Sequence, residues 1–183
     1  MTIGSDDDVA LAQTRDVREP ALVERHFGRI VRGGNAFAAL NTALFEDGAV
    51  VVVPAGVALA APIHVVHYSI ASDGPSVSHP RLLVIAGRNS EATVVESYGG
   101  GDGQEYLTNA VAEIVLEDGA ILDHYKVQRE SVPSFHISGL YLQASRDTSV
   151  ICNSVSLGGS LVRNEVTAVL DGEGAICTLN GIY

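Results

Sequence analysis

Tryptophan is absent from this sequence, and aromatic residues make up only 5% of its 183 residues. Any hydrophobic core must therefore be built mainly from valine, isoleucine, leucine and alanine. These small and branched side chains suit narrow, regular packing. Because 46% of the residues are hydrophobic and only 18% are charged, the composition is that of a globular protein and not of a disordered one.

Positive charge is also scarce, with 11 lysine and arginine residues against 22 aspartate and glutamate residues and a formal net charge of −11. This balance excludes nucleic acid and anionic membranes as partners, because both bind basic surfaces. No apolar run approaches the roughly 18 residues that a transmembrane helix needs. The N-terminal stretch MTIGSDDD is acidic where a signal peptide is basic and then apolar, so we expect a cytoplasmic protein.

Only two cysteines are present, Cys152 and Cys177. Neither a CxxC motif nor a group of four cysteines and histidines occurs, which excludes a disulfide framework and a structural zinc site. Both cysteines lie in strand-like runs, and we interpret them as buried structural thiols. Their offsets within the repeat described below differ by one residue, so we expect them on different faces and not in a shared cluster site.

Three segments differ in composition. Residues 1–17 are polar and acidic and predict a loose tail. Residues 18–45 have helical periodicity and predict an N-terminal helical segment. Residues 46–183 are rich in valine, isoleucine and threonine and are interrupted by Gly, Asp and Pro, a pattern typical of many short strands.

Two helices are expected in the second segment. The first is predicted to begin at Pro20 and to end at Gly33-Gly34, because proline suits a first helical turn and glycine stops a helix. The second is predicted to begin after Asn35, a favourable N-cap residue. The apolar residues with helical spacing are Val23, Phe27, Ile30 and Val31 in the first helix, and Phe37, Leu40 and Leu44 on one face of the second.

A turn-and-strand phrase recurs through residues 46–183, and each copy is a polar turn, a small residue and then a strand. The small residues act as anchors at Ala92, Ala120, Ser149 and Ala175, which are 28, 29 and 26 residues apart. Such a period predicts a solenoid whose coils stack on one another. An antiparallel sandwich would also contain short strands, but it does not require a near-constant period. We therefore predict an all-β fold, a parallel β-helix with a short N-terminal helical segment.

Stacked coils align equivalent residues into columns about 4.8 Å apart. The apolar column two residues after each anchor is Val94, Leu122, Ile151 and Cys177, which we expect to point inward. The column four residues after each anchor is Glu96, His124, Asn153 and Leu179. Its three polar members could form a hydrogen-bonded ladder or a small polar passage. The simpler interpretation is a solvated face or a purely structural ladder.

Other groups of polar residues do not form sites. His64 and His67 lie three residues apart in a strand, which places them on opposite faces and excludes a shared metal. Asp123 and His124 diverge for the same reason and form no dyad. The glycines at 99–101 are not followed by the Lys-Ser/Thr of a phosphate-binding loop. The sequence therefore predicts no catalytic, cofactor-binding or metal-binding residue in this chain.

Five phrases, in one order along the chain, resemble the SufB/SufD family, the paired scaffold proteins of the SUF iron–sulfur cluster assembly system. The phrases are FAALNTALFEDGAVVVVPAGV (37–57), PIHVV (62–66), HPRLLVIAGRNSEATVVESY (79–98), YLTNAVAEIVLEDGAILDHYKVQRES (106–131) and SLGGSLVRNEVTAVLDGEGAICTLNGIY (156–183). The spacing of FAALNTALFEDG, HPR…ATVVE and SLGG…VRN is closer to SufD than to SufB.

The resemblance implies a right-handed parallel β-helix and a scaffold that is not an enzyme. In that family, SufB and SufD pair through their β-helices, and each carries a subunit of the ATPase SufC. A SufB-like and a SufC-like protein are therefore the expected partners. No cofactor is expected in this chain, since the cluster and the use of ATP belong to the complete complex.

Members of that family continue beyond LNGIY (179–183) into further coils and a C-terminal helical segment, and their N-terminal helical region is longer. The chain therefore resembles a SufD-like protein truncated at both ends, without the cluster-site Cys and His positions and without the segment that docks SufC. An inactive fragment or paralogue is the alternative. We also expect the exposed backbone edge of the last coil to pair with a second chain, which would give a homo-oligomer.

A β-helix enzyme acting on polysaccharides is a third interpretation. Such an enzyme needs carboxylates grouped along an exposed groove. The acidic residues here lie mainly in turns, where turn chemistry already explains them. Those residues are Asp47, Asp118, Asp147 and Asp171. Aromatic residues that could stack on sugars are scarce as well, so we expect no enzymatic activity.

Overall fold

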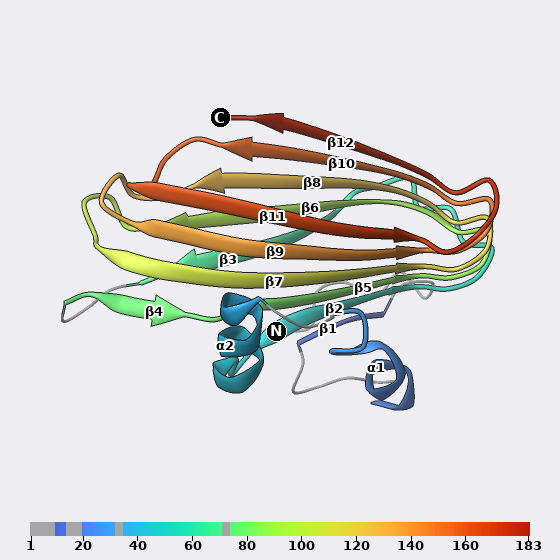
Figure 1. Cartoon of the computed structure of the whole chain (residues 1–183), viewed down its shortest axis with the longest axis horizontal. Coiled ribbons are helices and arrows are strands. Elements are labelled where there is room, and N and C mark those ends of the chain that lie inside the picture. Colours follow the sequence, from blue (N-terminus) through green and yellow to red (C-terminus); the bar gives the residue numbers. More distant parts are fainter. Residues whose placement is uncertain (1–9, 14–19, 32–34, 71–73) are drawn as a thin grey trace.

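Two β-sheets wind around a common axis in the computed structural model, and successive coils of the chain add strands to each sheet (Figure 1). The structure describes residues 10–13, 20–31, 35–70 and 74–183. Neighbouring strands within these ranges are parallel, except that β1 is antiparallel to β2. The predicted all-β parallel β-helix with a short N-terminal helical segment is therefore confirmed.

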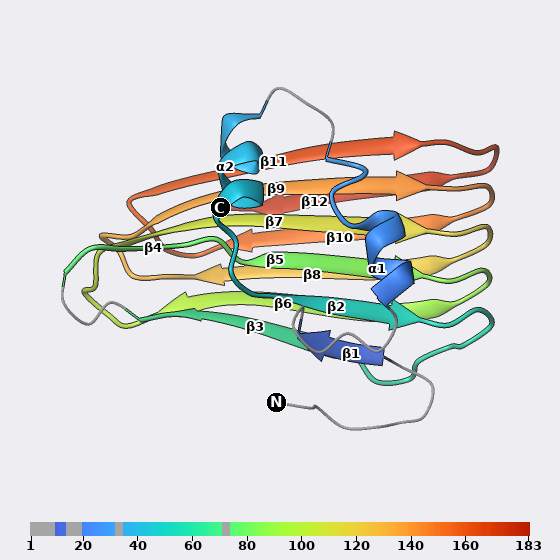
Figure 2. The ribbon, with the colours of Figure 1, turned by 90° about the horizontal axis from the view of Figure 1, so that it is seen from below.

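The seven-stranded sheet has the order β1-β2-β5-β7-β9-β11, with β4 beside β7, and the five-stranded sheet has the order β12-β10-β8-β6-β3. The strands of the seven-stranded sheet are β1 (Ala10–Gln13), β2 (Gly48–Val53), β4 (Ser76–Ser78), β5 (Arg81–Ala86), β7 (Tyr106–Leu116), β9 (Phe135–Ala144) and β11 (Leu161–Leu170). Those of the five-stranded sheet are β3 (Ile63–Ser69), β6 (Glu91–Gly100), β8 (Ile121–Arg129), β10 (Ser149–Ser156) and β12 (Ile176–Ile182). Helices α1 (Pro20–His26) and α2 (Ala36–Leu44) lie across the outer face of the seven-stranded sheet (Figure 2).

One corner of the coils passes through a residue with positive φ. The corner column is Gly56, Asn89, Gly119, Asp147 and Gly174, with φ of 75°, 52°, 72°, 56° and 75°. Backbone hydrogen bonds join successive members to the next coil; the Gly119 N–H, for example, donates to the Arg146 carbonyl oxygen at 2.9 Å. The recurring turn of the sequence is thus a left-handed corner, which glycine, asparagine and aspartate adopt more readily than other residues.

The corner column sets a register that differs from the predicted one. The small residue after the corner is Ser90, Ala120, Thr148 and Ala175 in successive coils. The predicted anchors Ala92 and Ser149 are therefore wrong by two residues and by one residue. Ala92 pairs with Leu122 and not with Ala120. The physical cause is that asparagine and aspartate replace glycine at two of these corners, so the Asp-Gly pattern does not mark them.

Both helices begin where the sequence predicted. Asn35 caps α2, since its side-chain oxygen accepts hydrogen bonds from backbone N–H groups two and three residues on, at 2.9 and 3.1 Å. Helix α1 begins at Pro20 but ends at His26, shortly before Gly28 with a φ of 71°. The predicted end at Gly33-Gly34 is therefore wrong for the helix, and those two glycines lie outside the described residues. Within the described ranges, no helix is long and apolar enough to cross a membrane.

The buried face of α2 differs from the predicted apolar face. Leu40 and Leu44 are 40% and 52% exposed, whereas Ala38 and Asn41 are buried. Asn41 determines this orientation, because its side-chain amide donates to the backbone oxygen of Asn109 at 2.8 Å and secures the helix to the sheet. A buried polar contact, which helical periodicity does not reveal, thus decides how α2 rotates.

Residues 10–13 form β1 and do not belong to a loose tail. The strand pairs with β2 in an antiparallel register from Ala10 opposite Val52 to Gln13 opposite Ala49. The expectation of a loose tail over 1–17 is therefore wrong for these four residues, and the remainder of that tail lies outside the described residues.

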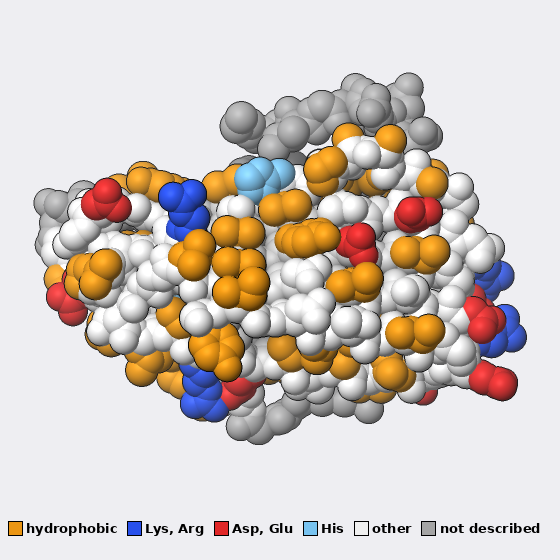
Figure 3. Space-filling model, turned by 90° about the horizontal axis from the view of Figure 1, so that it is seen from above, with side chains coloured by type: hydrophobic (Ala, Val, Ile, Leu, Met, Phe, Trp, Pro, Cys, Tyr) orange, Lys and Arg blue, Asp and Glu red, His pale blue; other side chains and the backbone are white. Residues whose placement is uncertain are grey.

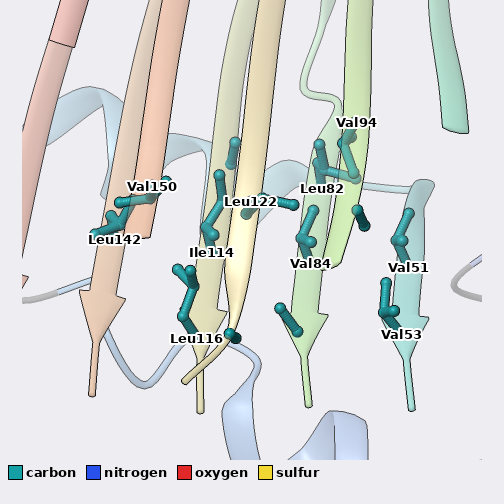
Figure 4. Packing of buried hydrophobic residues seen from close by; sticks show 14 of the residues in the cluster. Val51, Val53, Leu82, Val84, Val94, Ile114, Leu116, Leu122, Leu142 and Val150 are labelled. Atoms are coloured by element: carbon teal, nitrogen blue, oxygen red, sulfur yellow. The ribbon is translucent and has the colours of Figure 1, made fainter. Parts of the chain in front are cut away.

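Aliphatic side chains fill the space between the two sheets near the corner column, as the composition predicted (Figure 4). The residues labelled in the figure are Val51, Val53, Leu82, Val84, Val94, Ile114, Leu116, Leu122, Leu142 and Val150. Cys152 is buried in this cluster, and Cys177 packs against it while partly exposed. The prediction that the two thiols face different sides is therefore wrong. Ile151, predicted to point inward, is 38% exposed.

A buried ion pair attaches the helical segment to the seven-stranded sheet. Arg81 of β5 donates to Glu113 of β7 at 2.5 Å, and both side chains are fully buried. The Arg81 guanidinium also donates to the Asn41 side-chain oxygen of α2 at 3.0 Å and lies 4.9 Å from the centre of the Phe27 ring. The Gly28 N–H donates to Glu113 at 2.9 Å. One ion pair thus links the turn after α1, helix α2 and two strands.

We predict that Gly119→Ala lowers the free energy of unfolding by about 1–3 kcal/mol. Alanine is strained at a φ of 72°, and its Cβ would collide with the Asn89 side-chain oxygen. Urea denaturation measures the change. Gly181→Ala is the matched control, because no atom lies within 4 Å of the added Cβ and the φ is not left-handed. Equal losses in the two variants would contradict the assignment of a left-handed corner.

We predict that Glu113→Gln destabilises the protein by about 3–5 kcal/mol, because the buried Arg81 charge then has no carboxylate partner. Arg146→Ala is the control, since it removes the exposed Arg146–Asp118 pair at 3.3 Å and should cost below about 1 kcal/mol. The Arg81→Met/Glu113→Leu variant should recover much of the loss. Urea denaturation at neutral pH distinguishes these outcomes, and a Glu113→Gln loss as small as the control's would refute the role of the ion pair.

Candidate functional site

Inward-pointing side chains of the solenoid change from apolar to polar along each coil. Strand β8 shows the change, because Leu122 is followed at every second position by His124, Lys126 and Gln128, which are all buried. Residues of β3, β6, β9 and the loop after β8 join them. We call the set the interior polar cluster, and its members are His67, Glu96, Tyr98, His124, Lys126, Gln128, Glu130 and His136.

Glu96 is the carboxylate around which one half of the interior polar cluster is arranged. His124 Nε2 lies 3.2 Å from one carboxylate oxygen, and His67 Nε2 lies 3.7 Å from the other. The Tyr98 hydroxyl donates a short hydrogen bond to Glu96. Burial disfavours the charge, yet the hydrogen bond and charge of His124, aided by His67 and Tyr98, outweigh it and lower the pKa of Glu96 to about 2. Glu96 is therefore ionised at neutral pH.

Glu130 is the carboxylate of the other half. His136 Nδ1 lies 2.8 Å from Glu130 Oε2, the Thr108 hydroxyl donates to Oε1 at 2.6 Å, and Gln128 donates to Oε2 at 3.1 Å. Burial opposes ionisation, but the adjacent His136 ring and the Thr108 and Gln128 donors leave the pKa of Glu130 below its usual value. Burial lowers the pKa of His136, against the opposing effect of Glu130.

Lys126, the single lysine of the chain, is the strand partner of Glu96 and is close enough to both carboxylates for their charges to affect it. Its ammonium group donates to the Asn164 side-chain oxygen at 2.7 Å, forms a short hydrogen bond with Ser138 and lies 5.4 Å from the centre of the Tyr98 ring. Burial lowers the pKa of Lys126 to about 8, although the charges of Glu96 and Glu130 oppose this shift. A buried amine with such a pKa changes its protonation state close to neutral pH.

A cavity of about 60 Å³ lies beside Lys126 and extends toward the last coil. Its lining includes Glu96, His124, Cys152 and Asn164. Burial, with a smaller effect of Cys177, raises the pKa of the Cys152 thiol to about 12, so this sulfur is protonated and is a poor nucleophile and metal ligand. Among the described residues, no group of three or more His, Cys, Asp or Glu side chains could hold a metal ion. The interior polar cluster can therefore hold charged groups beside one another and can bind or release protons.

The structure brings together two of the three polar residues that the sequence placed in one column. Glu96 and His124 touch, but their backbone partners are Lys126 and Cys152, so they meet diagonally across β6 and β8. Asn153 lies on the outer face, where its side-chain oxygen accepts a hydrogen bond from the Asn180 amide at 2.9 Å. The three-residue ladder is therefore wrong, because it depended on the predicted anchors.

The predicted opposite directions of the side chains are confirmed for two pairs, His64 with His67 and Asp123 with His124. His64 is exposed and contacts Ser97 at 2.7 Å, whereas His67 points inward to Glu96. Asp123 and His124 likewise occupy outer and inner positions of β8. Lys126, Glu130 and His136 were not predicted from the sequence. The polar residues at every second position from 124 to 128 were the available signal for the polar interior.

We predict that a ¹³C-labelled Lys126 titrates with a pKa of about 8 in the folded protein and near 10.5 in urea. Because Lys126 is the only lysine, NMR should show a single titrating lysine resonance. A folded-state value near 10.5 would contradict the burial of its ammonium group.

The same shift predicts how stability depends on pH. Between about pH 8 and 10.5 the folded state binds fewer protons at Lys126 than the unfolded state, so this residue makes stability rise with pH over that window. Cys152 acts in the opposite direction above about pH 9, because its folded-state pKa is raised from 9.0 to about 12. The Lys126→Met variant retains the Cys152 effect and should lose only the rise, which thermal unfolding at several pH values measures.

Comparison with known proteins identifies the family. The model of the SUF system FeS cluster assembly SufBD core domain matches residues 68–183, and that of the SufBD protein N-terminal region matches residues 9–65. The SufBD family protein slr0076 of Synechocystis is 34% identical over 149 residues, which are 77% of this chain and 33% of that protein.

Two further relatives carry the names of the individual family members. SufD of Escherichia coli is 25% identical over 80% of this chain and 35% of its own length, and SufB of Bacillus subtilis is 25% identical over 93% of this chain and 36% of its own length. The chain thus spans about a third of the length of each of these relatives. Since the core-domain model covers most of the chain, and covers the stacked coils, the chain belongs to the SufBD family of iron–sulfur cluster assembly proteins.

Proposed function

We propose that this chain is a non-enzymatic, SufD-like scaffold component of SUF-type iron–sulfur cluster assembly. It works in the cytoplasm with a SufB-like protein and a SufC-like ATPase. The observation that carries this proposal is the coincidence of the SufBD core domain, residues 68–183, with the stacked coils of the β-helix. The cluster and ATP are handled by the assembled complex, and this chain supplies a surface held in a fixed geometry.

The contacts of the charged side chains favour a scaffold over an enzyme. The buried carboxylates have partners within the protein: Glu113 pairs with Arg81, and Glu130 accepts hydrogen bonds from Thr108 and Gln128. The exposed corner acids Asp118 and Asp147 lie 3.3 and 3.6 Å from Arg146, so ion pairing accounts for their position. These contacts give the carboxylates structural roles and weaken the interpretation of a polysaccharide-active enzyme.

The assignment to the SufD branch is the finer part of the proposal. It is supported by the spacing of the phrases at 37–48, 79–96 and 156–175. The named relatives support both branches, because SufD and SufB are each 25% identical to this chain. An inactive fragment or paralogue is the second candidate.

Co-purification distinguishes these functions. The tagged chain is expressed together with untagged SufB-like, SufD-like and SufC-like proteins from the same organism. A SufD-like chain should retain the SufB-like protein and not the SufD-like one, because it takes the place of the latter. The reverse pattern would assign the chain to the SufB branch.

Retention of neither protein by a chain whose circular dichroism shows a folded β-structure would support the inactive alternative and overturn the proposal. The Gly119→Ala variant, which keeps the surface but weakens the fold, is the control for binding by unfolded chains. If retention persists when this variant is largely unfolded, the association does not depend on the β-helix.

A further inference from the structure

The two sheets differ in what covers their outer faces. Helices α1 and α2 lie across the seven-stranded sheet, and the outer face of the five-stranded sheet points away from them (Figure 1). Figure 3 looks onto this second face, where hydrophobic side chains gather with few charges among them. Large apolar residues at its outward positions are Val66, Tyr68, Ile121, Tyr125 and Ile151, which are between 38% and 62% exposed.

Strand registry gives the pattern of this face. Outward side chains alternate with inward ones along every strand, and the parallel pairing aligns them into columns. Two neighbouring columns occupy the middle of the face. The first is His64, Val95, Tyr125, Asn153 and Asn180, and the second is Val66, Ser97, Val127, Val155 and Ile182. Both columns lack formally charged residues when histidine is neutral.

The central strand carries one charge of each sign on either side of these columns. Asp123 and Arg129 occupy outward positions of β8, two residues before Tyr125 and two residues after Val127. Within the described part of the chain, neither side chain forms an ion pair or a side-chain hydrogen bond. The face is therefore an apolar patch flanked by two unused charges of opposite sign.

This arrangement is complementary to itself under two-fold symmetry. A two-fold axis that runs along the stacking direction and passes over Lys126 of β8, midway between Asp123 and Arg129, lays each strand over its own copy in the reverse direction. Asp123 then lies opposite Arg129 of the second copy, and Tyr125 lies opposite Val127 of the second copy. Two sheets packed face to face are about 10 Å apart, a distance that an arginine and an aspartate can span.

We propose that the outer face of the five-stranded sheet binds a second copy of this chain in an isologous dimer with two Asp123–Arg129 contacts. Five strands about 4.8 Å apart and about seven residues long offer roughly 550 Å² per copy, or roughly 1,100 Å² in total. This area lies near the lower end of specific interfaces.

The distribution of charge favours association of two copies through this face. Two copies that each carry a formal net charge of −11 repel one another through most of their surfaces. The outward positions of the five-stranded sheet carry only Glu91, Asp123 and Arg129 as formal charges. Association through this face therefore meets the least repulsion and adds two attractive pairs.

Charge reversal in the full 183-residue chain tests the proposal by sedimentation velocity. Wild-type protein should show a concentration-dependent dimer. Asp123→Arg places two arginines opposite each other, and Arg129→Asp places two aspartates opposite each other, so each single variant should weaken dimerisation by at least about tenfold. The Asp123→Arg/Arg129→Asp double variant should restore it. Both positions are on the surface, and circular dichroism checks that each variant is folded.

An equimolar mixture of the two single variants gives the decisive measurement. One chain then carries only arginine and the other only aspartate at positions 123 and 129, so both contacts are complementary and a heterodimer should form that neither variant forms alone. Arg146→Asp, an exposed charge reversal at the corner column, is the control and should leave the dimer unchanged.

A monomer at all concentrations would overturn the proposal. A dimer that ignores both charge reversals would overturn it as well, and would indicate association elsewhere, such as through a backbone edge. Failure of the co-purification described above, with the dimer intact, would reject the assembly function and leave this interface unaffected.

Discussion

In-register stacking of parallel strands is the constraint on which the rest of this structure depends. Once one coil lies on another at the spacing of a β-sheet, every residue is aligned with its equivalent in the next coil. The corner column shows the consequence. A left-handed residue at Gly119 requires a left-handed residue above and below it, and Asn89 and Asp147 meet that requirement without being glycine. The glycine in turn leaves space for the asparagine side chain.

The same alignment separates the interior into an apolar end and a polar end. Val94, Leu122 and Val150 gather near the corner column, and Glu96, Lys126 and Glu130 gather at the other end. Buried charges are costly unless they are paired, and here each carboxylate has several hydrogen-bond donors. Charges inside the solenoid are therefore tolerated as a connected group, and Lys126 is the member whose protonation responds to pH near neutrality.

Such a frame suits a protein whose function depends on surfaces. The parallel ladder holds the outer residues of both sheets at fixed spacings. One outer face is covered by α1 and α2, which the Arg81–Glu113 pair secures, and the other is open and nearly free of charge. The scaffold function proposed above agrees with this division, since a scaffold requires rigid faces more than it requires a reactive pocket.

The sequence by itself determined the β-helix, the starts of both helices and the opposite directions of two pairs of side chains. A near-constant period predicted the β-helix, Asn35 predicted the start of α2, and the odd spacing of His64 and His67 predicted their opposite directions. The repeat period can be counted along the chain, and the helix start and the side-chain directions depend on neighbouring residues. The sequence is therefore sufficient to reveal all three. The tertiary structure decided the register, because two corners turn at asparagine and aspartate where the pattern required glycine. It also decided which polar groups meet. The contact of Glu96 with His124, the pairing of Lys126 with Glu96 and the rotation of α2 about Asn41 all depend on residues far apart in the chain.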